Sequence, residues 1–323
     1  MKNRKSGDAG IKYDPAQVRI HEAYTVAIRD LGVHGEGIGS VDGFTVFVHG
    51  ALPGEMVTAE ITLLKRSYAV GKLLSIEQES PFRTMPECSV YEHCGGCQLS
   101  HLTYEGQLDM KYRRVKDVIE RIAGESGDLV KPVLPAVHPF AYRNKMAVPA
   151  GLVKGKAALG CYRQGSHDII PVSSCAIQKE ENNRLLQFAR RFIEKYGISV
   201  YDEKTRKGSL RHVMGRVGDD GKVMVVLVTA SKTLPEEKRW IEEIQKELPE
   251  AVSLWHNIQP KPEIRYWARK SDTSGAEKRS LPLFADCDLK YPRTPSFRCI
   301  KSRRGFSMRK LWNTLISKAE KLS

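Results

Sequence analysis

The sequence predicts a multi-domain α+β chain that begins with a small antiparallel β-barrel of the oligonucleotide-binding type. Short segments of alternating apolar and polar residues, separated by glycine-rich turns, fill residues 24–76. Three closely spaced cysteines follow at residues 88–97, and residues 142–250 mix further strand patterns with two helical ones. At 323 residues the chain is long enough for two or more domains, each with its own core.

Composition and charge narrow the class of protein. Apolar residues make up 41% and charged residues 28% of the chain, as in ordinary globular proteins. No apolar run approaches the ~18 residues of a membrane span, so we expect no membrane partner. Seven cysteines, an odd number, and a polar N-terminal segment without a signal-peptide core favour the reducing cytoplasm over a secreted disulfide framework.

The net charge of +14 favours a nucleic-acid partner, but it is unevenly distributed. Residues 263–323 contain 15 Lys and Arg against 6 Asp and Glu, a balance of +9, which leaves +5 for the rest. The body of the chain is therefore only mildly basic. Residues 1–19 are predicted to be a disordered basic lead-in.

The barrel is predicted over residues 20–79. Residues 24–31, 43–50, 55–64 and 69–76 have the alternation of half-buried strands. The run Gly35-Glu-Gly-Ile-Gly39 resembles a dinucleotide-binding fingerprint, but another strand pattern follows it instead of a helix. A tight β-turn is the better interpretation.

The cysteine segment, residues 80–130, carries the most specific signal. The run CSVYEHCGGCQ places Cys88, Cys94 and Cys97 at C-x5-C-x2-C spacing, and Cys175 follows in SSCAIQ. Thiolates are soft ligands, and four of them suit an iron–sulfur cluster or a structural zinc ion. Spacing alone does not separate the two. Residues 102–124 have a helical period and end at Gly124.

Residues 131–262 are predicted to form a central α+β domain. Its strand patterns occupy residues 142–151, 157–163, 167–172, 210–218 and 222–230, and helical patterns occupy residues 183–197 and 234–250. Cys161, in the second of these strands, is interpreted as a strand residue rather than a ligand.

Several motifs, in order, resemble the bacterial RNA uracil-5 methyltransferases, in particular the branch that acts on 23S ribosomal RNA. They are GEGIGSVDGFTVFVHGALPGE, CGGCQLSHLTYEGQLDMK, YRNKMAVPA, GCYRQGSHDIIPVSSCAIQ, GSLRHVMGRVG and SLWHNIQP, and the resemblance covers roughly residues 21–262. It implies an N-terminal TRAM barrel, a [4Fe–4S] cluster bound by Cys88, Cys94, Cys97 and Cys175, and S-adenosylmethionine as the methyl donor. Its implied partner is ribosomal RNA with an exposed uridine in a loop, bound by a monomer.

The resemblance stops after Pro262, where a C-terminal, Rossmann-like methyltransferase domain should follow. We therefore expect that domain, with its cofactor site and catalytic cysteine, to be absent and the chain to be an N-terminal fragment, inactive alone. Residues 263–323 are interpreted as a non-family tail. Permissible codons for residues 263–278 and 290–299 can encode family-like sequence in another frame with one offset, which favours a frameshift over a divergent tail.

The candidate RNA contacts are basic side chains on the predicted barrel and central domain: Arg29, Lys65, Arg66, Lys72, Arg143, Lys145, Arg211 and His212. A solvated face or a purely structural role remains an alternative for each. Three functions stay open: a methyltransferase family member, a stand-alone RNA-binding module with a structural iron–sulfur or zinc site, and a redox protein. The last is disfavoured because no flavin or partner motif accompanies the cysteines.

Overall fold

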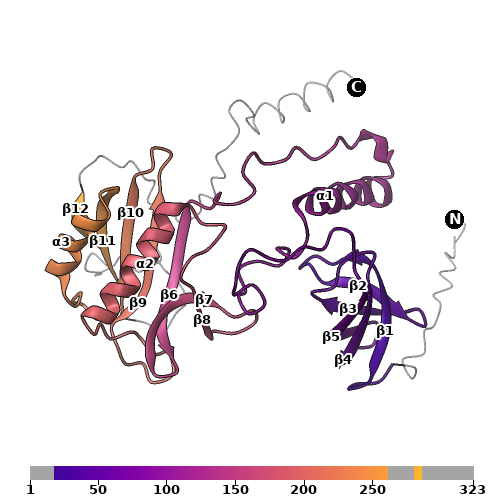
Figure 1. Cartoon of the computed structure of the whole chain (residues 1–323), viewed down its shortest axis with the longest axis horizontal. Helices are drawn as coiled ribbons and strands as arrows, with labels where there is room; N and C mark the ends of the chain where they lie inside the picture. Colours follow the sequence, from indigo (N-terminus) through magenta and orange to yellow (C-terminus); the bar gives the residue numbers. More distant parts are fainter. Residues whose placement is uncertain (1–17, 261–279, 286–323) are drawn as a thin grey trace, which may run out of the picture. The chain divides into compact units, whose positions relative to one another are not determined.

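The computed structural model describes residues 18–260 and 280–285, and it divides into two units, residues 1–134 and 135–323 (Figure 1). Most of the predicted lead-in therefore lies outside the described residues. So does most of the predicted tail, including Cys287 and Cys299.

The first unit begins with a closed five-stranded barrel, coloured indigo in Figure 1, with strand order β1-β2-β3-β5-β4. Its strands are β1 (Ala23–Leu31), β2 (Gly37–Val41), β3 (Phe44–His49), β4 (Met56–Leu64) and β5 (Ala69–Gln78). Alternate residues of each strand point inward, so that Val57, Ala59 and Ile61 of β4 are fully buried. The predicted strands are present, but β3 and β5 pair in parallel where an antiparallel barrel was expected.

The glycines of the Gly35–Gly39 run serve a turn and a close strand contact. Gly35 has φ +87°, which favours glycine, and β2 begins two residues later. A Cβ atom on Gly39 would lie only 2.4 Å from Val26 Cγ1, on the neighbouring strand β1. The interpretation of this run as a turn is confirmed for its start at Gly35, whereas Gly37–Gly39 belong to β2, which pairs with β3.

The cysteine segment continues from the barrel into α1 (Tyr104–Val118), a π-helical turn η2 (Ile119–Ala123) and a 3-10 turn η3 (Gly127–Leu129). The Thr103 hydroxyl caps α1 by accepting the Gly106 N–H, and Gly124 ends η2 in the left-handed conformation, as predicted. Leu31 and Leu52 of the barrel form a small core with Leu102, against which Met110 of α1 also packs.

The second unit is a seven-stranded sheet of order β12-β11-β10-β9-β6-β7-β8. Its strands are β6 (Lys145–Val153), β7 (Lys156–Tyr162), β8 (Ile169–Pro171), β9 (Leu210–Val217), β10 (Val223–Thr229), β11 (Ala251–Ile258) and β12 (Ser280–Ala285). The helices α2 (Glu180–Lys195) and α3 (Glu237–Glu247) pack together through the rings of Phe188, Phe192 and Trp240. Strand β12 lies within the segment that was predicted to be a non-family tail.

The fold class expected from the sequence gave this chain no C-terminal Rossmann-like methyltransferase domain, yet the sheet contains a parallel βαβ unit. Strands β10 and β11 are parallel and are joined through α3, so they form a βαβ unit of the kind from which Rossmann-like sheets are built. The sequence predicted β10 as a strand but not its parallel pairing with β11. A strand buried on both faces, such as VMVVLVT, is a continuous apolar run and has no alternation that indicates its neighbours. Strand β11 was not predicted at all.

Candidate functional site

The three cysteines of the first unit lie on a loop built from tight turns. The Tyr91 N–H donates to the Cys88 carbonyl at 3.1 Å, and the Cys94 N–H donates to the Val90 carbonyl at 2.9 Å. The Gly96 N–H donates to the Cys94 sulfur at 3.4 Å. All three thiols are half-buried. Backbone N–H groups aimed at sulfur stabilise a thiolate, so the loop suits soft-metal ligation.

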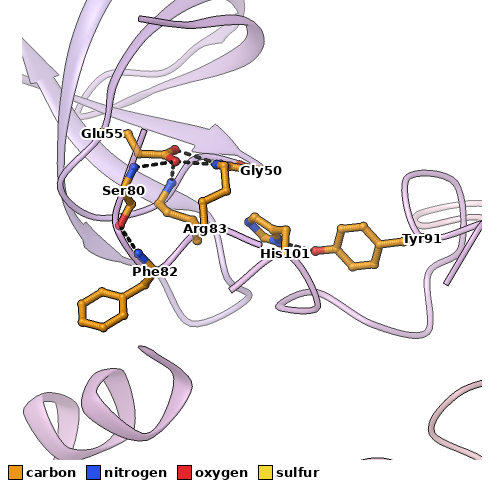
Figure 2. Close-up of polar contacts among 8 residues, drawn as sticks. Gly50, Glu55, Ser80, Phe82, Arg83, Tyr91 and His101 are labelled. Atoms are coloured by element: carbon orange, nitrogen blue, oxygen red, sulfur yellow. Dashed lines mark hydrogen bonds and ion pairs between the residues drawn. The ribbon is translucent and has the colours of Figure 1, made fainter. Parts of the chain in front are cut away.

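A buried ion pair attaches this loop to the barrel (Figure 2). Glu55, in the turn before β4, has a fully buried side chain and accepts from Arg83 Nη2 at 2.8 Å and from the Leu52 N–H at 2.8 Å. Arg83 also donates to the Gly50 carbonyl at 2.7 Å. Burial by itself raises the pKa of Glu55, but the Arg83 guanidinium and the amides of Leu52 and Ser80 outweigh it and hold the pKa below its usual value.

A second contact joins the cysteine loop to the segment before α1. The Tyr91 hydroxyl donates to the Gln98 carbonyl at 2.8 Å. It is also hydrogen-bonded to His101 Nδ1, as Figure 2 shows. Burial raises the pKa of Tyr91 to about 12, and burial followed by the Arg83 charge lowers the pKa of His101 to about 4. Both groups are therefore neutral at pH 7, and they fix the loop without a charge of their own.

Glu55, Arg83, Tyr91 and His101 were not among the sequence candidates. Tyr91 and His101 stand within the cysteine motif, so their proximity to the cysteines was available as a signal. Nothing in the sequence relates Glu55 to Arg83, because their contact spans 28 positions.

Cys175 lies in the second unit, in the loop before α2. Its N–H donates to Asn183 Oδ1 at 2.9 Å, and Asn183 Nδ2 donates to the Cys175 carbonyl at 3.2 Å. Asn183 belongs to the first turn of α2 and is buried. Its side chain therefore fixes both the N–H and the carbonyl group of Cys175. Cys161 is a residue of β7, opposite Ile170 of β8, as the strand interpretation predicted.

Within residues 18–260 and 280–285, no three His, Cys, Asp or Glu side chains form a ready-made metal site. The donor set nevertheless fits a soft metal centre, since three half-buried thiols are held within ten residues of one loop. Cys175 belongs to the other unit, and the four-cysteine ligand set stays a prediction.

The candidate RNA contacts on the barrel are all exposed. Arg29 lies on β1 and reaches Ser40 Oγ at 3.3 Å, whereas Lys65 and Arg66 occupy the turn between β4 and β5. Lys72 lies on β5, opposite Glu60 of β4 and His49 of β3. Their role as RNA contacts stays a prediction.

The candidates of the second unit fall into two groups. Arg211 and His212 are buried in β9, with 4% and 8% of their surface exposed. The Arg211 guanidinium donates to the Gln259 carbonyl at 3.0 Å and lies over the Tyr201 ring. Burial, then the Arg211 charge, lowers the pKa of His212 to about 3. By contrast, Arg143 is exposed and Lys145 half-buried, at the start of β6.

Lys145 also has a cationic neighbour that was not predicted. Arg216 of β9 lies directly opposite it in the β6–β9 register. Burial lowers the pKa of Lys145, and the charges of Arg216 and Arg143 lower it further.

Within the described part of the chain, no helix is long and apolar enough to cross a membrane.

Comparisons with known proteins relate the barrel to the TRAM domain family and a longer part of the chain to RNA methyltransferases. Residues 17–74 match the TRAM domain family. An uncharacterized RNA methyltransferase of Bacillus cereus is 47% identical over 245 residues, which are 76% of this chain and 53% of the relative. One of Clostridium tetani is 42% identical over 242 residues, covering 75% of this chain and 52% of the relative. The chain thus spans about half the length of these curated relatives.

A solved structure shares the fold. The crystal structure of the Pyrococcus abyssi tRNA (uracil-54, C5)-methyltransferase in complex with S-adenosyl-L-homocysteine matches with a TM-score of 0.57 and 23% identity. The match covers 76% of this chain and 53% of that chain. Because the chain follows a methyltransferase fold over this length, the expectation that such a fold is absent is corrected. The expectation of an inactive N-terminal fragment stays a prediction.

Proposed function

We propose that the protein acts in the S-adenosylmethionine-dependent methylation of uridine C5 in 23S ribosomal RNA, in the cytoplasm. The observation that carries the proposal is the 47% identity to an RNA methyltransferase over 245 residues, and the match of residues 17–74 to the TRAM domain family supports it. The described residues contribute RNA binding through the barrel and the basic side chains at the start of β6. A C5 reaction needs an exposed base, so the target is a uridine in a loop.

The residues described here do not fit a cofactor cradle of the glycine-rich type. The connection from β10 to α3, residues 230–236, contains no glycine, whereas such cradles bring a glycine-rich turn close to the cofactor. No step of the reaction is therefore assigned to this βαβ unit, and S-adenosylmethionine is proposed for the whole protein only.

We further propose Cys88, Cys94, Cys97 and Cys175 as ligands of a [4Fe–4S] cluster, with zinc as the alternative. Bound by four thiolates, either centre supplies a structural cross-link rather than an electron. The chain's own residues prepare the site. Arg83 and Glu55 fix the start of the cysteine segment, Tyr91 and His101 fix its loop, and Asn183 fixes Cys175.

The proposed reaction is tested in cells. Deleting the gene should remove 5-methyluridine from one position of 23S ribosomal RNA, as measured by mass spectrometry of RNase fragments, and the intact gene should restore it. Unchanged 5-methyluridine would contradict the methyltransferase proposal. If the purified chain still bound RNA, that result would favour a stand-alone RNA-binding module.

A further inference from the structure

Two cations face each other across neighbouring strands of the second unit. Lys145 of β6 is the direct partner of Arg216 of β9 in the antiparallel register, and Arg143 lies two residues before Lys145. Like charges placed directly opposite each other in a sheet destabilise it. The folded chain therefore holds an unfavourable charge arrangement at this point.

No acidic side chain relieves the repulsion among the described residues. The ion pairs of the second unit involve other cations, such as Arg184 with Glu250 and Lys195 with Glu243. Arg143, Lys145 and Arg216 take part in none of the ion pairs formed between described residues. Lys145 and Arg216 are also half-buried, which makes solvent screening less effective.

The backbone of this cluster is fixed from the loop before α2. The Arg143 N–H donates to the Ile177 carbonyl at 2.8 Å, and the Arg143 carbonyl accepts from the Lys179 N–H at 3.1 Å. Gln178 Nε2 donates to the Lys145 carbonyl at 3.3 Å. The backbone that carries Arg143 and Lys145 is thus fixed before any ligand arrives, which lowers the entropy cost of binding.

The cluster lies on the sheet face away from α2. A Cβ atom on Gly215 would lie 2.3 Å from Asn182 Oδ1, so that position faces α2. Neighbouring residues of a strand point to opposite faces, so Arg216 and its partner Lys145 face the other side. Lys145 and Arg216 are both partly exposed, so an anion can reach them on this side without displacing α2.

We propose that Arg143, Lys145 and Arg216 form a binding site for the backbone phosphates of single-stranded RNA. The site rests on the proposed function and deepens it, by naming the chemical group that these side chains take. Phosphate removes the repulsion between Lys145 and Arg216, and the planar guanidinium groups match it with paired N–H donors. The cost of placing like charges together is thereby offset in the complex.

The test uses the full chain with a labelled single-stranded RNA over a series of salt concentrations. Lys145→Gln and Arg216→Gln should each weaken binding several-fold and make the slope of log affinity against log salt shallower by about 0.7 per lost phosphate contact. Lys238→Gln, an exposed change on α3, is the matched control and should leave the slope unchanged. Each cluster variant should also be as stable as the parent chain or more stable, since it removes a repulsion.

The outcomes separate the two proposals. If the parent chain binds no RNA, the proposed RNA-binding function fails. If the parent binds RNA but the cluster variants keep its salt slope, the phosphate site alone is overturned. A loss of stability in both variants would show that the cations support the fold instead. An equal loss of binding to polyglutamate would show a general anion site and would also overturn the assignment to RNA.

Discussion

Glu55 illustrates how a single buried carboxylate organises the first unit. Its two oxygens together accept hydrogen bonds from Arg83, Leu52 and Ser80, which belong to the barrel and to the start of the cysteine segment. A buried charge is tolerated only when it is paired and fully hydrogen-bonded. The contact fixes the start of the cysteine segment against the barrel, because moving Arg83 away would leave the Glu55 charge buried and unpaired.

Removing the partner of Glu55 should be costly. Arg83→Met leaves an uncompensated buried carboxylate, and we expect the first unit to lose about 3–5 kcal/mol of unfolding free energy. The double variant Glu55→Gln with Arg83→Met should recover part of that loss, because no charge is left buried. Denaturant unfolding of the full chain measures both. An Arg83→Met chain as stable as the parent would contradict this role.

The cysteines make a second prediction at the residue scale. If the proposed cluster forms, Cys175→Ser replaces one of its soft ligands with a hard one, so the anaerobically prepared variant should hold less iron and sulfide than the parent chain. Cys161→Ser is the matched control, since this cysteine is also half-buried but lies on β7. Metal analysis of the purified proteins decides the case. If the parent chain instead contained stoichiometric zinc and no sulfide, the site would be assigned to zinc and not to an iron–sulfur cluster.

At the scale of the elements, tertiary packing around α1 requires a glycine, although glycine has a low helix propensity. Glycine weakens a helix interior, yet Gly106 lies in the first turn of α1. A Cβ atom there would lie 2.7 Å from Leu102 Cδ1 and 3.0 Å from Phe82 Cβ, within the small core between α1 and the barrel. The close approach of the helix start to this core requires the missing side chain.

Gly106→Ala should therefore destabilise the first unit, although alanine favours helix by about 1 kcal/mol. Overpacking typically costs about 1–3 kcal/mol, so a net loss is expected. The exposed neighbour Glu105→Ala serves as the control and should change stability little. Thermal unfolding compares the variants, and a more stable Gly106→Ala chain would show that the core yields easily.

At the scale of the molecule, each unit buries a histidine in its neutral form. Burial is the main reason that the pKa of His101 falls to about 4 and that of His212 to about 3, from an ordinary value of 6.5. The unfolded chain takes up these protons at a higher pH than the folded chain does. The stability that depends on them is therefore complete above pH 6.5 and is lost as the pH falls toward 4.

Unfolding measured between pH 7 and 4 should accordingly show a falling stability in both units. His101→Gln should reduce the pH dependence of the first unit, because glutamine takes up no proton. His34→Gln, which replaces an exposed histidine of the barrel, is the matched control for the His-to-Gln substitution. Equal pH profiles for the parent and the His101 variant would refute the assignment.

The sequence by itself determined the barrel strands, the helices and the cysteine spacing. Each of these depends on residues close together along the chain, such as the alternation of β4 or the helix that ends at Gly124. The relatives found by comparison agree with the resemblance carried by the same motifs.

Only the tertiary structure decided which residues meet across long stretches of chain. It paired Glu55 with Arg83, placed Arg216 opposite Lys145, made β10 and β11 parallel, and buried Arg211 and His212. Strand β9 lies between β10 and β6, so its polar residues Arg211 and His212 are enclosed. The physical reason is that periodicity records which face of an element is buried, whereas strand order and register depend on contacts between distant elements.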